Sequence, residues 1–281
     1  MRLRFTKMHG IGNDYVYVDA FAQPLADPAA VARRVAPRRT AIGSDGLILI
    51  APSETADVRM EMYNADGSRG AMCGNGVRCV AKYAWDHGLA RRNPMRVETD
   101  SGVKTVDLRL ERDLVAAVAV DMGPPILDPG QVPIAAPARM IDASFAIDGR
   151  DLRITCISMG NPHCVIFVDS TEDAPVTTLG PRIEVHPLFP QRVNVEFVQL
   201  LGTAPADRLR MRVWERGSGE TAACGTGACA VAVAAALTGR GRRSVEIELV
   251  GGNLQIDWRE ADDHVIMSGG ATEVFTGEID L

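Results

Sequence analysis

The sequence has no long apolar run. No stretch approaches the ~20 apolar residues that a helix needs to cross a bilayer, and Met1 to Lys7 lack the apolar centre of a secretory signal peptide. We therefore expect a cytoplasmic protein without membrane contact. In that compartment cysteines are usually reduced, so we expect thiols at positions 73, 79, 156, 164, 224 and 229.

Three further absences exclude classes of function. The net charge is −6 rather than positive, which argues against nucleic acid as a partner. No Cys-x-x-Cys pair occurs and the 5 histidines are scattered, so we expect no metal site. Gly10-x-Gly12 lacks the third glycine of a dinucleotide motif and no Walker lysine pattern is present. Nucleotide binding is therefore not expected.

Two stretches share one pattern around a cysteine. They are Ala71-Met72-Cys73-Gly74-Asn75-Gly76 and Ala222-Ala223-Cys224-Gly225-Thr226-Gly227. Both continue into helical patterns, Val77 to His87 and Ala228 to Leu237, with Val and Ala at matching positions after the cysteine. Each pattern predicts a glycine turn that leads into a helix. The first helix has an apolar stripe, whereas the second is apolar on nearly every side and should be buried all round.

A cysteine at a helix start has a distinctive environment. The first-turn amides there lack intrahelical partners, and the helix end carries about +0.5 of a charge. Such a site lowers a thiol pKa from ~8.5 toward neutrality and binds carboxylate. Two buried core cysteines are the alternative. Two matched sites favour a pair of thiols, Cys73 and Cys224, that face each other across one anion.

The second half of the chain repeats the order of the first. The repeat includes Gly12-Asn13 and Gly160-Asn161, and it places Tyr63-Asn64 and Trp214-Glu215 at the same distance before each cysteine. A Pro-rich stretch from Gly123 to Pro137 separates the halves. Strands and one long helix in each half predict an α+β fold. We expect two similar domains, each a curved, mainly antiparallel sheet or barrel around a central helix, with the active site in the interdomain cleft.

Five motifs, taken in this order, resemble those of the diaminopimelate epimerases. They are Met8-His9-Gly10-x-Gly12-Asn13-Asp14-Tyr15, Tyr63 to Ser68, Cys73-Gly74-Asn75-Gly76-x-Arg78-Cys79, Ser158 to His163, and Trp214-Glu215-Arg216-Gly217 through Cys224-Gly225-Thr226-Gly227. The resemblance implies a pyridoxal-independent enzyme, with no cofactor, that interconverts LL- and meso-2,6-diaminopimelate in lysine and peptidoglycan precursor synthesis. It also implies a homodimer. Because C-terminal strands complete the first domain in this family, we expect domains at 1–121 plus 266–281 and at 122–265.

The chemistry that the resemblance implies needs two proton-transfer groups. Inversion of an α-carbon requires a base on one face and an acid on the other. Without a cofactor, preorganised dipoles must stabilise the carbanion. The amides near Gly74, Asn75, Gly225 and Thr226 are expected to do so. By resemblance, Cys73 is the base toward the LL isomer and Cys224 is the acid.

The remaining motif residues are expected to bind the distal end of the substrate. By resemblance the distal carboxylate is held by Asn64, Asn161, Asn194 and Arg216. Glu215 would take the distal ammonium with Asn13 nearby, and His163 and Glu215 would support the thiols. Taken singly, Asn64 and Asn161 could serve only as turn residues, and Glu215-Arg216 could be a solvated hairpin pair. Two departures from the family are Gly46, where some members carry Gln, and Thr226, where Ser is common.

Three other functions remain open from the sequence. A proline or hydroxyproline racemase of the same fold would not need Glu215 and Arg216 to bind a second charged end. A dithiol redox protein would usually carry Cys-x-x-Cys, which is absent. A non-catalytic amino-acid-binding protein would not need both thiols.

Overall fold

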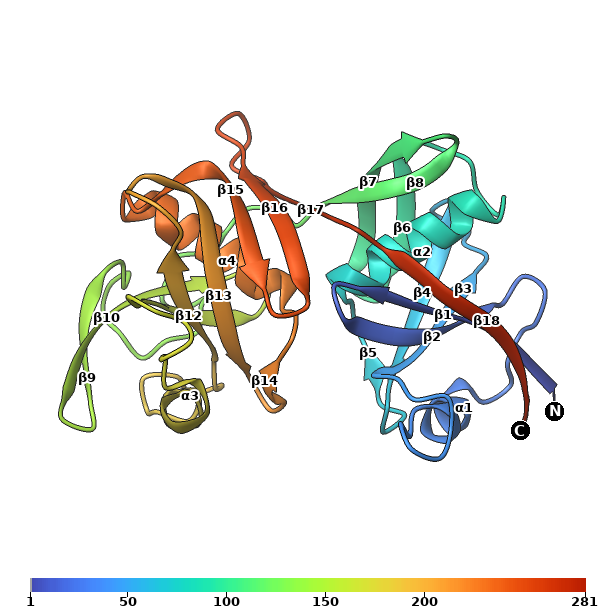
Figure 1. The fold of residues 1–281 in the computed structure, drawn as a ribbon, viewed down its shortest axis with the longest axis horizontal. Coiled ribbons are helices and arrows are strands. Elements are labelled where there is room, and N and C mark those ends of the chain that lie inside the picture. Colours follow the sequence, from blue (N-terminus) through green and yellow to red (C-terminus); the bar gives the residue numbers. More distant parts are fainter. Residues whose placement is uncertain (1) are drawn as a thin grey trace. The chain divides into compact units, whose positions relative to one another are not determined.

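The computed structural model describes residues 2–281, which form two compact units (Figure 1). One unit contains the chain up to Asp121 together with Ser268–Leu281, and the other contains Met122–Met267. Strand β17 (Val265–Gly269) carries the chain from the second unit back to the first. Each unit consists of strands around one long helix, so the prediction of an α+β fold with two similar units is confirmed.

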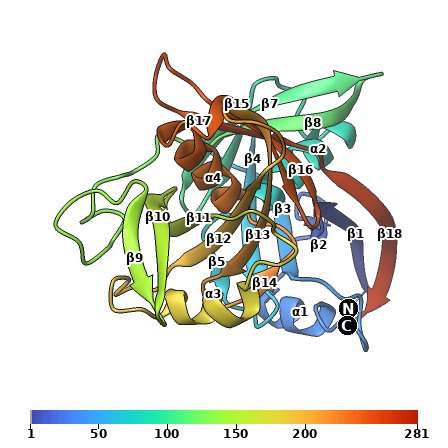
Figure 2. The same cartoon turned by 60° about the vertical axis from the view of Figure 1, so that its left-hand side comes forward.

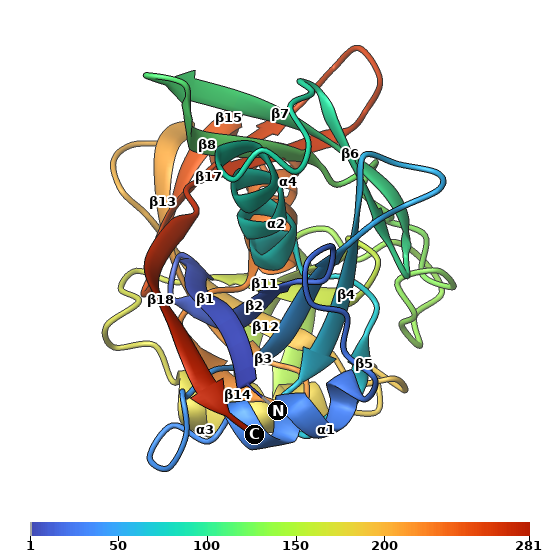
Figure 3. The ribbon, with the colours of Figure 1, turned by 90° about the vertical axis from the view of Figure 1, so that its right-hand side faces the viewer.

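In the first unit, strands surround helix α2 (Figure 3). Its elements are β1 (Arg2–Gly10), β2 (Asn13–Asp19), α1 (Pro28–Val35), β3 (Gly46–Ala51), β4 (Val58–Asn64), β5 (Arg69–Gly70), α2 (Gly74–Asp86), β6 (Met95–Thr99), β7 (Gly102–Glu111), β8 (Leu114–Asp121) and β18 (Thr272–Asp280). β1 pairs antiparallel with both β2 and β18. β2 and β3 are parallel, as are β4 and β6. The sheet is therefore mainly antiparallel with two parallel steps.

Helix α2 buries the face that its sequence predicts. Val77, Val80, Ala81 and Ala84 are fully buried, as their i, i+3, i+4, i+7 spacing requires. The helix ends at Asp86, and Gly88 follows it with a φ of +73°. Glycine adopts this left-handed conformation without steric strain, which is why it commonly follows a helix. The stripe fixes which side of the helix packs on the strands.

The second unit follows the same plan around α4 (Figure 2). Its elements are β9 (Ala143–Ile147), β10 (Arg150–Ser158), β11 (Pro162–Phe167), α3 (Val176–Glu184), β12 (Asn194–Leu200), β13 (Ala206–Glu215), β14 (Gly219–Thr221), α4 (Gly225–Leu237), β15 (Gly241–Leu249) and β16 (Gly252–Trp258). Every residue of α4 from Gly227 to Ala235 is buried, which confirms the prediction from its all-round apolar character. Small Ala and Val side chains let neighbouring strands approach the helix closely.

The two units also share a strand register. In β11 and β12, which are parallel, Val165 pairs with Glu196. In β2 and β3, also parallel, Tyr17 pairs with Ile48. Tyr17 and Val165 each lie four residues after the asparagine of the repeated Gly-Asn pair. Glu196 and Ile48 therefore occupy equivalent places in the two units.

Among residues 2–281, no helix combines the length and the apolar character needed to span a bilayer.

Candidate active site

Cys73 is the N-cap residue of α2. Its backbone is extended, with φ −135° and ψ 120°, and its carbonyl accepts the first intrahelical bond, from the Val77 amide at 2.9 Å. The amides of Gly74 and Asn75 therefore lie in the first turn, where no intrahelical acceptor is available. The structure thus places these amides at the positive end of the helix, beside the thiol, as predicted.

Two asparagine side chains lie beside the Cys73 thiol. Its Sγ donates to Asn13 Oδ1 at 3.2 Å, and Asn75 Nδ2 donates to the same oxygen at 3.3 Å. Asn13 is held in turn because its Nδ2 donates to Asp45 Oδ2 at 2.7 Å. The Cys73 side chain is half-buried. Three of the predicted residues, Asn13, Asn75 and Cys73, thus form one cluster at the start of α2.

Arg78 supports this cluster and had no predicted role. It is fully buried, with NH2 2.8 Å from Asn75 Oδ1 and Nε 3.2 Å from the Gly270 carbonyl oxygen. A buried charge must be hydrogen-bonded to be tolerated. Arg78 therefore ties the first turn of α2 to the segment that precedes β18. The sequence does contain one indication of this role: Arg78 is a charged residue within the otherwise apolar part of the predicted helix.

A charged group behind Asn13 orients it. Asp45 accepts from Asn13 and also from Arg38 NH2 at 2.7 Å. Arg38 forks across both oxygens of Asp14, at 2.6 and 3.2 Å. Burial acts to raise the pKa of Asp14, but the hydrogen bonds from Arg38 and Lys7 outweigh it and lower that pKa overall. Asp14 is thus kept ionised beside the start of β2.

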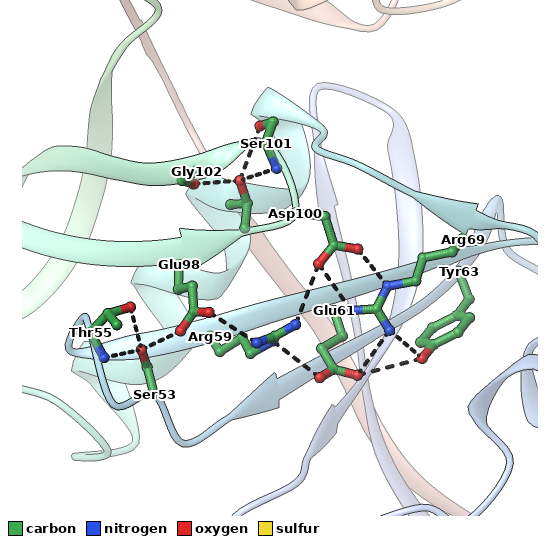
Figure 4. Close-up of polar contacts among 11 residues, drawn as sticks. Ser53, Thr55, Arg59, Glu61, Tyr63, Arg69, Glu98, Asp100, Ser101 and Gly102 are labelled. Atoms are coloured by element: carbon green, nitrogen blue, oxygen red, sulfur yellow. Dashed lines mark hydrogen bonds and ion pairs between the residues drawn. The ribbon is translucent and has the colours of Figure 1, made fainter.

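Asn64 closes the turn between β4 and β5. Its Nδ2 donates to Ser68 Oγ at 2.9 Å, and its backbone amide donates to the Ser68 carbonyl at 2.8 Å. A network of charges next to this turn joins β4, β5, β6 and the residue after β6 (Figure 4). It comprises Arg59, Glu61, Arg69, Glu98 and Asp100. The turn role of Asn64 is therefore visible in the structure, and its role in substrate binding stays a prediction.

Cys224 is the N-cap residue of α4, in the same extended conformation as Cys73. Its φ is −128° and its ψ 102°, and its carbonyl accepts from the Ala228 amide at 3.0 Å. Thr226 Oγ1 lies 3.7 Å from Sγ. A Cβ added at Gly227 would lie 2.9 Å from Glu196 Oε1 and 3.1 Å from Cys224 Sγ. Glycine at this position therefore allows the thiol and the carboxylate to share one small space.

His163 lies between two side chains of the second unit. Its Nδ1 is 2.6 Å from Glu196 Oε1, and its Nε2 is 3.1 Å from Asn161 Oδ1. His163 and Glu196 are both completely buried. Predicted residues Asn161 and His163 are thus brought together. Glu196 was not predicted, and the only signal for it was one acidic residue inside an otherwise apolar strand.

His163, Glu196 and Cys224 could also be considered as metal ligands. One possible ligand atom from each lies within 4.8 Å of the others. Two nitrogen or oxygen ligands on a tetrahedral zinc ion, each about 2.0 Å from the metal, are about 3.3 Å apart. The separation of His163 Nδ1 and Glu196 Oε1 is 2.6 Å, which is the spacing of a hydrogen bond. The geometry therefore fits a proton-sharing pair.

Glu215, Arg216 and Asn194 meet at the turn after β13. Asn194 Oδ1 accepts from the Arg216 amide and its Nδ2 donates to the Pro162 carbonyl, both at 2.9 Å. The Thr221 hydroxyl donates to Glu215. Glu184, which had no predicted role, holds the same turn through the Gly217 amide at 2.9 Å. Asn194 therefore fastens this turn to the start of β11 and retains further hydrogen-bonding capacity for a ligand.

The electrostatics of Cys224 differ from the expectation for a helix start. Burial raises the pKa of the Cys224 thiol well above its ordinary value, and the negative charges of Glu215 and Glu196 raise it further. Hydrogen bonds from Thr226 and from the Gly227 amide lower it by less. The prediction that the helix start would bring this thiol pKa down is therefore wrong for Cys224. Burial likewise raises the pKa of Glu215, more than its bond from Thr221 lowers it.

Solved structures share this two-unit fold over the whole chain. A phenazine biosynthesis protein of the PhzF family from Bacillus anthracis matches with a TM-score of 0.72, 16% sequence identity and coverage of 100% of both chains. A hydroxyproline epimerase from Agrobacterium vitis matches with a TM-score of 0.67 and 16% identity, covering 99% of this chain and 91% of the other. The architecture is thus that of a fold class which includes amino-acid epimerases.

Sequence comparison narrows the class to one family. The family model described as diaminopimelate epimerase matches residues 5–127 and 155–274. A diaminopimelate epimerase from Moorella thermoacetica is 53% identical over 281 residues, covering 99% of this chain and 100% of the relative. One from Acetivibrio thermocellus is 49% identical over 280 residues, covering 99% of each. The chain belongs to the diaminopimelate epimerase family.

Proposed function

We propose that the protein interconverts LL- and meso-2,6-diaminopimelate by moving an α-proton between two thiols. Full-length relatives named for this activity support the proposal, and they favour it over proline or hydroxyproline racemisation. The observation that carries the mechanism is the matched pair of N-cap cysteines, Cys73 and Cys224, at the starts of α2 and α4. This activity would serve lysine and peptidoglycan precursor synthesis.

The two thiols take opposite parts in one turnover. From the LL isomer, the Cys73 thiolate removes the α-proton and becomes a thiol, leaving a carbanion. The Cys224 thiol then gives its proton to the opposite face of that carbon and becomes a thiolate. The raised pKa of Cys224 supports this assignment, because it keeps this cysteine protonated at neutral pH. In the reverse reaction the parts are exchanged.

Helix dipoles would replace the electron sink that a cofactor provides. The first-turn amides of Gly74, Asn75, Gly225 and Thr226 would bind the α-carboxylate and stabilise negative charge as the proton leaves. Such dipoles are already oriented before the reaction, so they need no reorganisation in the transition state. We propose no metal or organic cofactor for this step.

The second end of the substrate would be bound by groups that the structure holds in fixed orientations. We assign the distal carboxylate to Asn64, Asn161, Asn194 and Arg216, with a two-pronged contact from the guanidinium. Glu215 would bind the distal ammonium with Asn13 nearby, and His163 and Glu215 would support the thiols. The Asn194 side chain, which accepts from the Arg216 amide and donates to the Pro162 carbonyl, supports this assignment because Asn194 and Arg216 are direct neighbours.

We also propose that the protein is a cytoplasmic homodimer. The family resemblance is the reason for expecting a dimer, and reliance on two reactive thiols suits a reducing compartment. Light scattering of the purified, reduced protein should give about twice the 30.2 kDa chain mass. A monomeric mass with full activity would contradict this proposal.

The deciding experiment incubates the reduced protein with LL-diaminopimelate in D₂O and separates the products on a chiral column. We expect meso product that carries one α-deuterium. Cys73→Ala and Cys224→Ala should each lower kcat/KM by about 10³-fold or more, because each lacks one of the two proton-transfer groups. Cys229→Ala, which removes another buried thiol from α4, is the matched control and should stay active. Turnover of proline or hydroxyproline in place of diaminopimelate would overturn the substrate but keep the mechanism.

A further inference from the structure

A buried carboxylate occupies a place that the fold fills with an apolar side chain elsewhere. Glu196 on β12 and Ile48 on β3 are equivalent by strand register. They are equivalent in packing too: a Cβ on Gly227 would lie 2.9 Å from Glu196 Oε1, and one on Gly76 would lie 2.8 Å from Ile48 Cδ1. Both glycines lie three residues after the N-cap cysteine. The architecture therefore does not require an acid at this position.

The surroundings of Glu196 are unfavourable for a charge that served only stability. The side chain is completely buried, and its Oε2 has no hydrogen-bond partner among residues 2–281. A buried polar atom without a partner destabilises the folded state. Even a paired buried charge commonly adds little stability compared with a well-packed apolar residue. Packing therefore does not account for Glu196.

The partner of Glu196 is the imidazole of His163, which contacts one oxygen through each ring nitrogen. His163 Nε2 lies 3.1 Å from Asn161 Oδ1, an acceptor, which favours the tautomer with a hydrogen on Nε2. The contact of 2.6 Å between His163 Nδ1 and Glu196 Oε1 then needs a second proton between the two atoms. The pair thus shares one proton inside the second unit.

This pair adjoins the Cys224 thiol. Glu196 Oε1 and Cys224 Sγ lie on either side of the space left by Gly227, and the thiol, carboxylate and imidazole atoms fall within 4.8 Å of one another. The ionisable and polar groups that face Cys224 are Glu196 from β12, His163 from β11, Glu215 from the end of β13 and Thr226 from α4. Glu215 and Glu196 both act to raise the Cys224 thiol pKa and so disfavour its thiolate. Glu196 does so as the oxygen end of a pair that is neutral overall, an effect that depends on Oε1 lying beside Sγ.

We propose that Glu196 is a positioning residue for the Cys224 thiol: it fixes His163 through their shared proton and holds Cys224 in its protonated, proton-donating form. This inference rests on the proposed function and deepens it, because it explains why one of two similar helix starts supplies the acid. Glu196 does not need to touch the substrate. Its effect should therefore fall on the proton-transfer step rather than on binding.

The first test needs no substrate. Glu196→Gln keeps the shape of the side chain but removes its negative charge. Iodoacetamide labelling, followed by mass spectrometry of the Cys224 peptide between pH 6.5 and 9.5, reports ionisation because the thiolate is the nucleophile. We expect Cys224 in the variant to react about tenfold faster at a fixed pH, equivalent to one unit of pKa. Cys73 in the same sample is the internal control and should react at an unchanged rate.

Glu184→Gln is the matched control for loss of a buried carboxylate. Glu184 lies in the same unit, but its oxygens accept from Trp214 Nε1 at 2.7 Å and the Gly217 amide at 2.9 Å. Its substitution should leave the Cys224 labelling profile unchanged. Equal labelling of Cys224 in wild type and Glu196→Gln would overturn the proposal. So would an equal shift in both variants.

The second test measures turnover. In Glu196→Gln we expect kcat to fall by roughly 10- to 1,000-fold, the range in which orienting carboxylates act, while KM changes by less than about twofold. Glu196→Ile, which copies the first unit, should lower kcat at least as far because His163 loses its partner. A rise in KM with unchanged kcat would overturn the proposal. A wild-type protein inactive on diaminopimelate would instead refute the proposed function, and labelling would still decide the part played by Glu196.

If neither Glu196 variant folds, the unsubstituted protein gives the answer. Proton NMR at low temperature should show the Nδ1 proton of His163 far downfield, as a short hydrogen bond requires, and His163→Asn should remove the signal. Failure to observe it would overturn the shared proton.

Discussion

The two units present their cysteines on the same backbone but in different electrostatic surroundings. Cys73 is half-buried, and its thiol donates to the neutral amide oxygen of Asn13 at 3.2 Å. Cys224 is buried beside the carboxylates of Glu215 and Glu196. Both are extended N-cap residues followed by Gly-x-Gly. A helix start therefore does not by itself determine whether a cysteine is acid or base.

The difference arises from side chains on a neighbouring strand. Gly76 packs against Ile48 and Gly227 against Glu196, so an equivalent contact is apolar in one unit and ionisable in the other. In the first unit Tyr15 stands where His163 stands in the second, each two residues after the asparagine of the Gly-Asn pair. A third difference is Glu215, which raises the Cys224 pKa and stands where the first unit has Asn64. Side chains at these three equivalent positions therefore distinguish the surroundings of the two thiols.

Exchanging the residues at the equivalent positions 48 and 196 should have the largest effect on stability. Ile48→Glu places a carboxylate beside α2, where Tyr15 replaces the imidazole partner, so we expect it to destabilise the protein by about 3 kcal/mol or more. Glu196→Ile should destabilise it by less, because it removes a buried carboxylate whose Oε2 has no partner, at the cost of one hydrogen bond to His163. Urea unfolding monitored by circular dichroism measures both. Equal losses of stability would show that the two positions are not equivalent.

Alanine substitution at the two matched glycines, Gly227 and Gly76, should affect mainly kcat at the first and mainly stability at the second. At Gly227 the new Cβ would press on Glu196 Oε1 and Cys224 Sγ, so we expect kcat to fall by about 10- to 100-fold. At Gly76 it would press on the ends of the Ile48 and Met60 side chains, which can shift. There we expect a loss of about 1 kcal/mol in stability and at most about a threefold change in kcat. A larger kcat effect at Gly76 would contradict the comparison.

The features that the sequence could predict are those set by residues close together in the chain or by the repeated pattern of the two halves. The Cys-Gly-x-Gly pattern, the stripe from Val77 to Ala84 and the apolar run of α4 follow from 3.6-residue periodicity and glycine chemistry. These are interactions between residues close in the chain. They were sufficient for the α+β class and for placing both cysteines at helix starts.

What the sequence could not predict depends on register between distant strands. Glu196 meets His163 only because β11 and β12 are parallel with His163 opposite Asn194. In a single sequence, an acidic residue in an apolar strand is equally consistent with a solvent-facing position. The pKa expectation for Cys224 failed first because burial disfavours its thiolate, and second because carboxylates from other strands face it. The helix-end effect is local, whereas the opposing carboxylates come from other strands.

Alkylation rates should show the difference between the cysteines directly. At pH 7 we expect iodoacetamide to label Cys73 at least about tenfold faster than Cys224. Burial and the raised pKa of Cys224 both reduce its accessible thiolate. Peptide mapping by mass spectrometry measures the two rates in one sample. In 6 M guanidinium chloride the rates should converge, and a ratio that persisted there would show that the fold is not its cause.

The last expected effect is the pH dependence of stability that comes from one buried thiol. Burial raises the pKa of Cys79 to about 11, whereas an unfolded thiol titrates near ~8.5. The folded state thus favours the protonated form, so this stability is fully present below pH ~8.5 and declines as pH rises toward 11. Between pH 7.5 and 9.5 the protein should lose about 1.4 kcal/mol through Cys79. Cys79→Ser should flatten the pH profile of urea unfolding by that amount. Equal slopes in Cys79→Ser and wild type would show that the thiol does not titrate differently on folding.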